Sequence, residues 1–181
     1  MSEEMIVRYC SPTLAGIKTG SLFSAAFASK KECVETLRGW NALLLRKGLR
    51  AVPFGSGNGR TAVYVYRISR LDHDLRNAEA RCILYERGYD CDRPERCIAR
   101  LARRLKNRGE YPHEIGLFLG YPPEDVSGFI NNAECKLSGA WKVYGDKHRA
   151  EKIFAQYKKC TRIYCELFYK GKSVERLTVA G

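Results

Sequence analysis

Apolar residues recur along the chain at two spacings, and the spacing predicts which segments form strands and which form helices. An apolar run rich in β-forming residues predicts a short strand over Met5–Cys10. Ser11-Pro12-Thr13 would end this strand and open a helix over 14–27. A capping-box pattern at Ser29 predicts the start of the next helix, and Gly48 predicts its end.

Two further apolar runs, Leu49–Phe54 and Thr61–Ile68, are separated by the glycine-rich segment GSGNGR. Strand-like residues on both sides of such a turn predict a β-hairpin. A glycine-rich loop can also cradle a phosphate, but that kind of loop lies between a strand and the first turn of a helix. Because a strand follows these glycines, we interpret the segment as a hairpin turn.

Most of the remaining chain has the apolar period of helices, with prolines and glycines at the boundaries. Helices are expected from Ser69 through the seventies, over Ala78–Arg87, from Asp92 through Leu105, from Pro112 to Gly120, from Pro122 to about Asn131 and from Asp146 to Gly171. One more strand is expected over Gly139–Tyr144. These elements predict an α+β fold, with a small three- to four-stranded sheet, including the hairpin, covered by several helices in a single domain over 1–181.

The composition excludes several classes of protein. With 45% hydrophobic and 29% charged residues, the chain is not expected to be disordered. No apolar run approaches the roughly 20 residues that a membrane-spanning helix needs, and the first residues lack the basic segment of a signal peptide.

Eight cysteines without an export signal indicate free thiols and a cytoplasmic location. Cys82, Cys91 and Cys97 lack the paired spacing of a zinc site, and buried core thiols are the simpler expectation.

The net charge of +12 is distributed unevenly along the chain. Segment 87–108 holds eight basic and three acidic residues, and segment 142–172 holds nine and three, whereas segment 109–141 holds one and five. Five arginines lie opposite the apolar stripe of one expected helix: Arg93, Arg96, Arg100, Arg103 and Arg104. This face suits an acidic protein, such as a flavodoxin, or nucleic acid, although a solvated surface also explains it. No helix-turn-helix, zinc-finger or RNP pattern supports nucleic-acid binding.

Cys10 is a candidate reactive thiol. The expected change from strand to helix at this residue would place the thiol at a helix N-terminus, which lowers a cysteine pKa. Lys18 and Ser21 are close enough in sequence to share a pocket with it. Cys10-Ser11-Pro12-Thr13 has the outline of a thioredoxin-like redox loop, but no second strand follows at the required place, so that fold is not inferred. An inert, half-buried cysteine is the alternative.

His113 is a second candidate, because it precedes a short segment too apolar to be exposed all round. A helix N-terminus there would lower the histidine pKa and leave a neutral imidazole able to act as a base or a ligand. Alternatively, His113 only caps the helix or bonds to Asp125 or Tyr144. His113-Glu114 lacks the second histidine of a zincin motif, so no metal site is predicted.

Three motifs together resemble a known family. They are Cys10-Ser-Pro-Thr-Leu-Ala-Gly-Ile-Lys18 with Ser21-Leu22-Phe23, Tyr111-Pro-His-Glu-Ile-Gly-Leu-Phe-Leu-Gly-Tyr-Pro122 with Glu124-Asp125-Val126, and Trp141-Lys-Val-Tyr144. The chain resembles, over essentially its whole length, a domain-of-unknown-function family of clostridia and related anaerobic Firmicutes. The resemblance implies a cytosolic bacterial protein and supplies no reaction.

These candidates lead to one expected cleft and three functional hypotheses. The cleft would be lined by Cys10, Lys18, His113, Glu114, Lys142 and Tyr144, with Ser21 beside Lys18. The first hypothesis is a non-enzymatic binding protein whose cleft or basic face takes an anionic ligand or an acidic protein. The second is a thiol enzyme in which Cys10 is the nucleophile, His113 its base, Glu114 the orienting group and Lys18 the anion holder. The third is a nucleic-acid-binding protein. No pattern identifies a cofactor.

Overall fold

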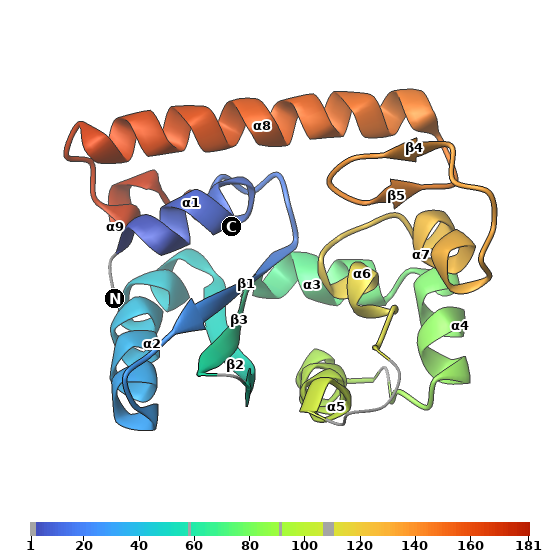
Figure 1. Ribbon diagram of the computed structural model, residues 1–181, viewed down its shortest axis with the longest axis horizontal. Coiled ribbons are helices and arrows are strands. Elements are labelled where there is room, and N and C mark those ends of the chain that lie inside the picture. Colours follow the sequence, from blue (N-terminus) through green and yellow to red (C-terminus); the bar gives the residue numbers. More distant parts are fainter. Residues whose placement is uncertain (1–2, 58, 91, 107–110) are drawn as a thin grey trace.

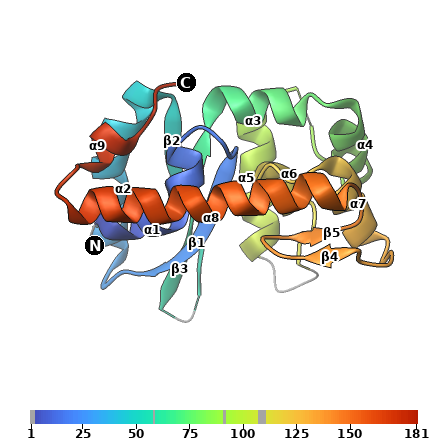
Figure 2. The same cartoon turned by 90° about the horizontal axis from the view of Figure 1, so that it is seen from above.

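A long helix, α8 (Lys147–Tyr169), runs along one side of the molecule, and the other elements lie beneath it in two groups (Figure 1). The first group contains α1 (Glu3–Leu14), α2 (Lys30–Leu44), α9 (Val174–Leu177) and a three-stranded sheet. The second contains α3 (Ile68–Leu75), α4 (Ala78–Glu86), α5 (Pro94–Lys106), α6 (Ile115–Phe118), α7 (Pro123–Ile130) and the short strands β4 (Leu137–Ser138) and β5 (Lys142–Val143). Seen from above, α8 crosses both groups (Figure 2). The structure is a computed structural model that describes residues 3–57, 59–90, 92–106 and 111–181.

The three-stranded sheet is antiparallel, and helices cover both of its faces. Its order is β1 (Gly20–Ala26), β3 (Arg60–Arg67) and β2 (Leu49–Gly57), with β3 in the middle. Val63 and Val65 point from β3 into the core shared with α1 and α2, whereas Tyr64 and Tyr66 point into the core of the second group. Burial on both faces explains why the β3 sequence is apolar almost without interruption.

The α+β fold class and several local predictions are confirmed. β2 and β3 form the expected hairpin, and Asn58 of its turn lies outside the described residues. Ser29 caps α2, accepting a hydrogen bond of 3.1 Å from the Glu32 backbone N–H. Gly48 ends the 3₁₀ turn that follows this helix with φ +77°, a conformation that glycine adopts without strain.

Two predictions near the N-terminus are wrong. Met5–Cys10 lies inside helix α1, and the segment 14–27, expected as a helix, contains strand β1. Ile6, Cys10 and Leu14 are four residues apart and fully buried, so they form one stripe of α1 against the sheet. This packing overrides the β propensity of the run. Cys10 is therefore in the middle of a helix, and its expected position at a strand end is also wrong.

Other elements begin at different residues or are shorter than predicted. Helix α3 begins at Ile68, one residue before the expected start at Ser69, and the helix expected from Pro112 begins at Ile115. Of the strand expected over 139–144, only Lys142 and Val143 pair, with β4.

Helix α8 contributes to two apolar cores. Phe154 and Tyr157 pack with Trp141 in a small core beside β5, while Tyr164 and Phe168 pack against the core around α1. The helix therefore joins both groups of elements. In the parts of the chain that the structure describes, no helix is both long enough and apolar enough to cross a bilayer.

Candidate functional site

An apolar cavity of about 330 Å³ opens between α6, α7 and β5, and we call it the aromatic pocket. Its lining residues are Tyr111, His113, Ile115, Gly116, Tyr121, Asp125, Val126, Phe129, Trp141 and Lys142. The His113 ring meets Phe129 edge-on, with 4.8 Å between ring centroids, and the Lys142 ammonium lies 5.4 Å from the Phe129 centroid. Of the residues predicted for a common cleft, the structure thus brings His113 and Lys142 together.

The side chain of Asp125 holds this pocket in shape. Asp125 is 3% exposed, and its carboxylate accepts 2.7 Å hydrogen bonds from the Trp141 indole N–H and from the backbone N–H groups of Tyr144 and Gly145. Asp125 lies in the first turn of α7, where the helix dipole favours a negative charge. Close packing of Tyr144 on Gly128, where a Cβ would lie 2.4 Å from the ring, also joins α7 to β5. Tyr144 is consequently a packing residue behind the pocket.

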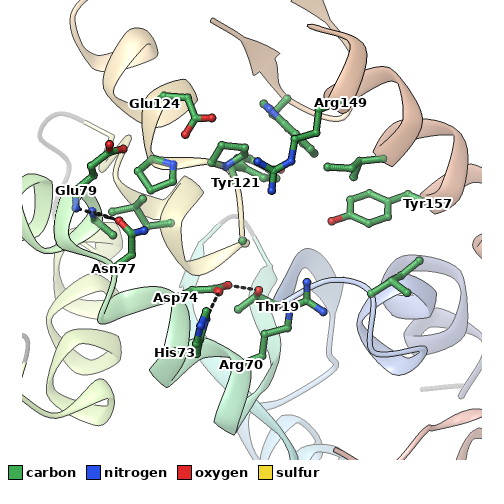
Figure 3. Close-up of a pocket in the computed structure, with 18 of the residues that line it drawn as sticks. Thr19, Arg70, His73, Asp74, Asn77, Glu79, Tyr121, Glu124, Arg149 and Tyr157 are labelled. Atoms are coloured by element: carbon green, nitrogen blue, oxygen red, sulfur yellow. Dashed lines mark hydrogen bonds and ion pairs between the residues drawn. The ribbon is translucent and has the colours of Figure 1, made fainter. Parts of the chain in front are cut away.

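Tyr121 and Trp141 form a wall between the aromatic pocket and a second cavity. Their rings are stacked, with centroids 4.8 Å apart, and both residues line both cavities. The second cavity, which we call the polar cleft, has a volume of about 590 Å³ and lies between α3, α4, the start of α7 and α8 (Figure 3).

Charged groups of opposite sign line different sides of the polar cleft. Arg70 of α3 and Arg149 of α8 lie on one side together with Tyr157, whose hydroxyl points into the cleft (Figure 3). Glu79 of α4 and Glu124 of α7 lie on the other side. Burial raises the pKa of Tyr157 to about 12, so its hydroxyl keeps its proton and can donate a hydrogen bond at neutral pH.

Asp74 lies at the base of the polar cleft and is already engaged (Figure 3). One carboxylate oxygen accepts a hydrogen bond from the Thr19 hydroxyl, and the other lies 3.3 Å from Nδ1 of His73. The acid thus separates the hydroxyl from the imidazole. The hydrogen bond from Thr19 to Asp74 anchors the loop before β1 to α3.

Lys18 lies behind the aromatic wall. Its ammonium is 5.6 Å from the Tyr121 ring centroid and 5.7 Å from that of Tyr157. Burial lowers the pKa of Lys18. Lys18 does not line either cavity. Its charge adds positive potential behind Tyr121 and Tyr157, which both line the polar cleft.

The structure places Cys10 near Lys18 and Ser21, but Cys10 does not line the pocket that contains His113. Cys10 is 0% exposed in the core between α1 and the sheet, and burial raises its pKa to about 12, although Lys18 and Ser21 act in the opposite direction. Ser21 is also buried and shares a 2.9 Å hydrogen bond with Thr13. A thiol in this setting is protonated at neutral pH and is a poor nucleophile. His113 belongs to the aromatic pocket, which Cys10 does not line.

Glu114 points away from the aromatic pocket into a buried charge cluster. It is 1% exposed, accepts a 2.7 Å hydrogen bond from the Tyr89 hydroxyl and lies 3.0 Å from Nε of Arg104. Arg87 is 3.9 Å from its other oxygen. Burial and the bond to Glu114 raise the pKa of Tyr89, which keeps this hydroxyl a donor. Glu114 therefore joins α5 to α6 structurally.

The predicted row of arginines on α5 is largely committed to partners within the chain. Arg104 pairs with Glu114, and Arg96 pairs with Asp90 at 2.7 Å. Arg100 donates to the carbonyl of residue 87 at 3.0 Å and packs over the Tyr89 ring. Among the described residues, only Arg93 and Arg103 of the five show no such partner, so the exposed positive charge is smaller than the sequence suggests.

Sequence analysis missed the residues of the polar cleft. They come from five helices, α3, α4, α6, α7 and α8, and from connecting loops, so most of them are far apart in the sequence. A weak signal was present in the proline pair before Glu124, which places that acid in the first turn of α7. Across the described ranges, no group of three or more His, Cys, Asp or Glu residues is arranged to hold a metal ion.

Comparison with known proteins identifies a family. The family described as "Protein of unknown function (DUF3793)" matches residues 6–178, whereas no curated protein and no solved structure matches the chain. The expected resemblance to a family of unknown function is thereby confirmed. Because the match extends over nearly all of the 181 residues, this chain belongs to that family.

Proposed function

We propose that the protein is a non-enzymatic binding protein that holds a small amphipathic anion in the aromatic pocket. The observation that carries this proposal is an apolar cavity with two basic side chains, Lys142 and His113, among its lining residues. Apolar cavities with a few convergent polar groups are the usual form of small-molecule sites.

The size and walls of the pocket indicate the body of the ligand. Its volume of about 330 Å³ lies at the lower end of the range for ligand sites. Ile115, Val126 and Phe129 supply the apolar surface, and Trp141 closes the side toward the polar cleft. These walls suit one aromatic ring or a branched aliphatic group.

The polar groups indicate the charge of the ligand. Asp125 is the acid in the lining, and it already accepts three hydrogen bonds. The basic groups left to receive a ligand are Lys142 and His113, which favour a carboxylate or another oxyanion. Lys142 rests over Phe129, so it can turn toward an anion without leaving the rim.

The other hypotheses receive less support from the geometry. A thiol enzyme would need Cys10 to be ionised and next to His113, but Cys10 is enclosed in a different core. Nucleic-acid binding would need free arginines on α5, and three of the five predicted ones have partners within the chain. A cytoplasmic location is part of the proposal and is supported by the seven described cysteines, which are all free.

The test uses Trp141 as an internal reporter. The chain has two tryptophans, so a Trp40→Phe background leaves only Trp141, which lines the pocket. A panel of aromatic and branched carboxylates, beginning with 3-phenylpropionate, is titrated while the emission of Trp141 is recorded. We expect saturable binding that is about tenfold weaker for the uncharged amide of the same acid.

Substitutions then locate the site. Lys142→Gln should weaken carboxylate binding about tenfold by removing the cation. Lys152→Gln removes the same charge from an exposed position on α8 and should have no effect. Phe129→Ala should weaken both the acid and the amide. The proposal is wrong if no carboxylate of the panel binds better than its amide, or if Lys142→Gln behaves like Lys152→Gln.

A further inference from the structure

We propose that the polar cleft is a second, separate ligand site that takes a small zwitterion, with its acidic group toward Arg149 and Arg70 and its ammonium toward Glu124 and Glu79. This inference does not depend on the aromatic pocket, because only the wall of Tyr121 and Trp141 is common to the two cavities.

Three donors define the anion end of the cleft. Arg149 makes no ion pair within 4.0 Å with any described residue, and in Figure 3 its guanidinium lies over Tyr121 in the cleft. Arg70 uses Nη1 to donate to the Gly16 carbonyl at 2.5 Å, which fixes the side chain and leaves its other N–H groups available. The Tyr157 hydroxyl is the third donor, and it points between the two arginines (Figure 3). Two guanidinium groups and a phenol are a strong set of donors for one oxyanion.

Two carboxylates define the cation end. Glu79 and Glu124 lie in the first turns of α4 and α7 respectively, and both are exposed. Neither makes an ion pair with a described residue, unlike Glu114 and Asp74, whose carboxylates are bonded within the chain. A simple anion would be repelled from this side of the cleft, whereas an ammonium group would be attracted to it.

The dimensions and the separation of charges exclude simpler occupants. The volume of about 590 Å³ exceeds that needed for a single ion. A metal ion would need clustered acids, and the described residues contain no such cluster. A molecule with an acidic group at one end and an amino group at the other satisfies both sides.

The experiment compares whole zwitterions with their halves on the Trp40→Phe protein. The probes are 6-aminohexanoate, which has a carboxylate, and phosphoethanolamine, which has a phosphate. Hexanoate and hexylamine, and inorganic phosphate and ethanolamine, are the corresponding halves. Binding is measured by calorimetry and by the emission of Trp141. We expect at least one zwitterion to bind about tenfold more tightly than either of its halves, and the better of the two identifies the acidic group.

Matched variants identify the residues. Arg149→Gln and Tyr157→Phe should each weaken the zwitterion, Arg149→Gln by about tenfold, whereas Arg46→Gln, at an exposed arginine elsewhere, should not. Glu124→Gln should weaken the zwitterion but not its acidic half. Phe129→Ala, in the aromatic pocket, should leave this binding unchanged.

Three outcomes would overturn the proposal. They are zwitterions that bind no better than their halves, an Arg149→Gln variant that matches Arg46→Gln, and loss of binding in Phe129→Ala. Thermal unfolding of each variant shows that it is folded before the affinities are compared.

Discussion

Cys10 and Cys135 differ in exposure, and this difference governs how their thiols can react. Cys10 is enclosed on all sides, whereas Cys135 is exposed and donates only a weak hydrogen bond to the Leu137 carbonyl. Because the thiolate is the reactive form, burial protects Cys10 both by excluding reagents and by raising its pKa. Iodoacetamide should therefore label Cys135 well before Cys10 in the folded protein.

The raised pKa of Cys10 predicts a pH dependence of stability. In the unfolded chain this thiol ionises near pH 9, and in the folded protein only near about pH 12. Its contribution to stability is complete below pH 9 and is lost as the pH rises toward 12, because the unfolded state releases the proton first. The free energy of unfolding should fall by up to ~1.4 kcal/mol per pH unit in this window.

Urea unfolding between about pH 8 and pH 10.5 tests this prediction. The Cys10→Ala variant is less stable at every pH because of the cavity it creates, but its stability should fall less steeply above pH 9. Cys82→Ala, at an exposed position, is the control and should keep the slope of the unmodified protein. Equal slopes for Cys10→Ala and the unmodified protein would contradict the assignment.

At the scale of elements, the accuracy of the sequence predictions depended on how local the determinants are. Ser29 and Gly48 act within one turn of their own helix, and the hairpin depends on a few adjacent residues, so these features were predictable. The strand β1 depends instead on β3, a partner about forty residues away. Helix α1 was mistaken for a strand because β-forming residues fill it, although Ile6 and Cys10 keep helical spacing.

The candidate site also combines features that the local sequence determines with features that depend on distant parts of the chain. The placement of His113 before a buried short helix, and of Lys142 on a strand, could be anticipated from apolar patterning. The bond between Asp125 and the Trp141 indole could not, because it joins α7 to β5 only after both have folded. Most of the polar cleft could not be anticipated, because exposed charged residues such as Arg70 and Arg149 give no periodic pattern.

Substitution of Asp125 tests whether its hydrogen bonds hold α7 and β5 together. Asp125→Asn keeps the shape but replaces one accepting oxygen by an N–H₂ donor, which must face either the Trp141 indole or the backbone N–H groups of Tyr144 and Gly145. We expect a loss of about 2–3 kcal/mol in the free energy of unfolding. The emission of Trp141 should shift to longer wavelength as β5 loosens.

The neighbouring acid provides the control. Glu124→Gln changes an exposed carboxylate in the same helical turn and should alter stability by less than about 0.5 kcal/mol. Urea unfolding and fluorescence measure both variants. If Asp125→Asn is as stable as Glu124→Gln and its emission is unchanged, then Asp125 does not hold the wall of the pocket.

At the scale of the whole molecule, two features join distant parts of the chain. Helix α8 packs against both groups of elements, and the buried Arg67 joins β3, the end of α1 and the C-terminal segment. The guanidinium donates to the carbonyls of Thr13, Leu14 and Val179 at 2.7, 2.7 and 2.8 Å. Two of these acceptors lie at the C-terminal end of α1, where the helix dipole favours a cation.

Arg67 should consequently be among the residues whose loss destabilises the fold most. Arg67→Met fills similar space but removes the side-chain donor that the Thr13, Leu14 and Val179 carbonyls share, and we expect a loss of about 3 kcal/mol or more in urea unfolding. Arg67→Lys keeps the charge but cannot reach all three acceptors, so its loss should be intermediate.

Arg60→Met provides the comparison on the same strand. Arg60 also donates to a carbonyl, that of Ser24, but it is exposed, and its replacement should cost less than about 1 kcal/mol.

Amide exchange distinguishes a local from a global effect, because the Val179 N–H bonds to the Leu14 carbonyl beside Arg67. In Arg67→Met this amide should exchange faster under conditions where β3 stays protected, since the C-terminal segment loses one of its two bonds to the body of the protein at this point. Equal losses for Arg67→Met and Arg60→Met, or unchanged exchange at Val179, would show that Arg67 does not hold the C-terminal segment in place.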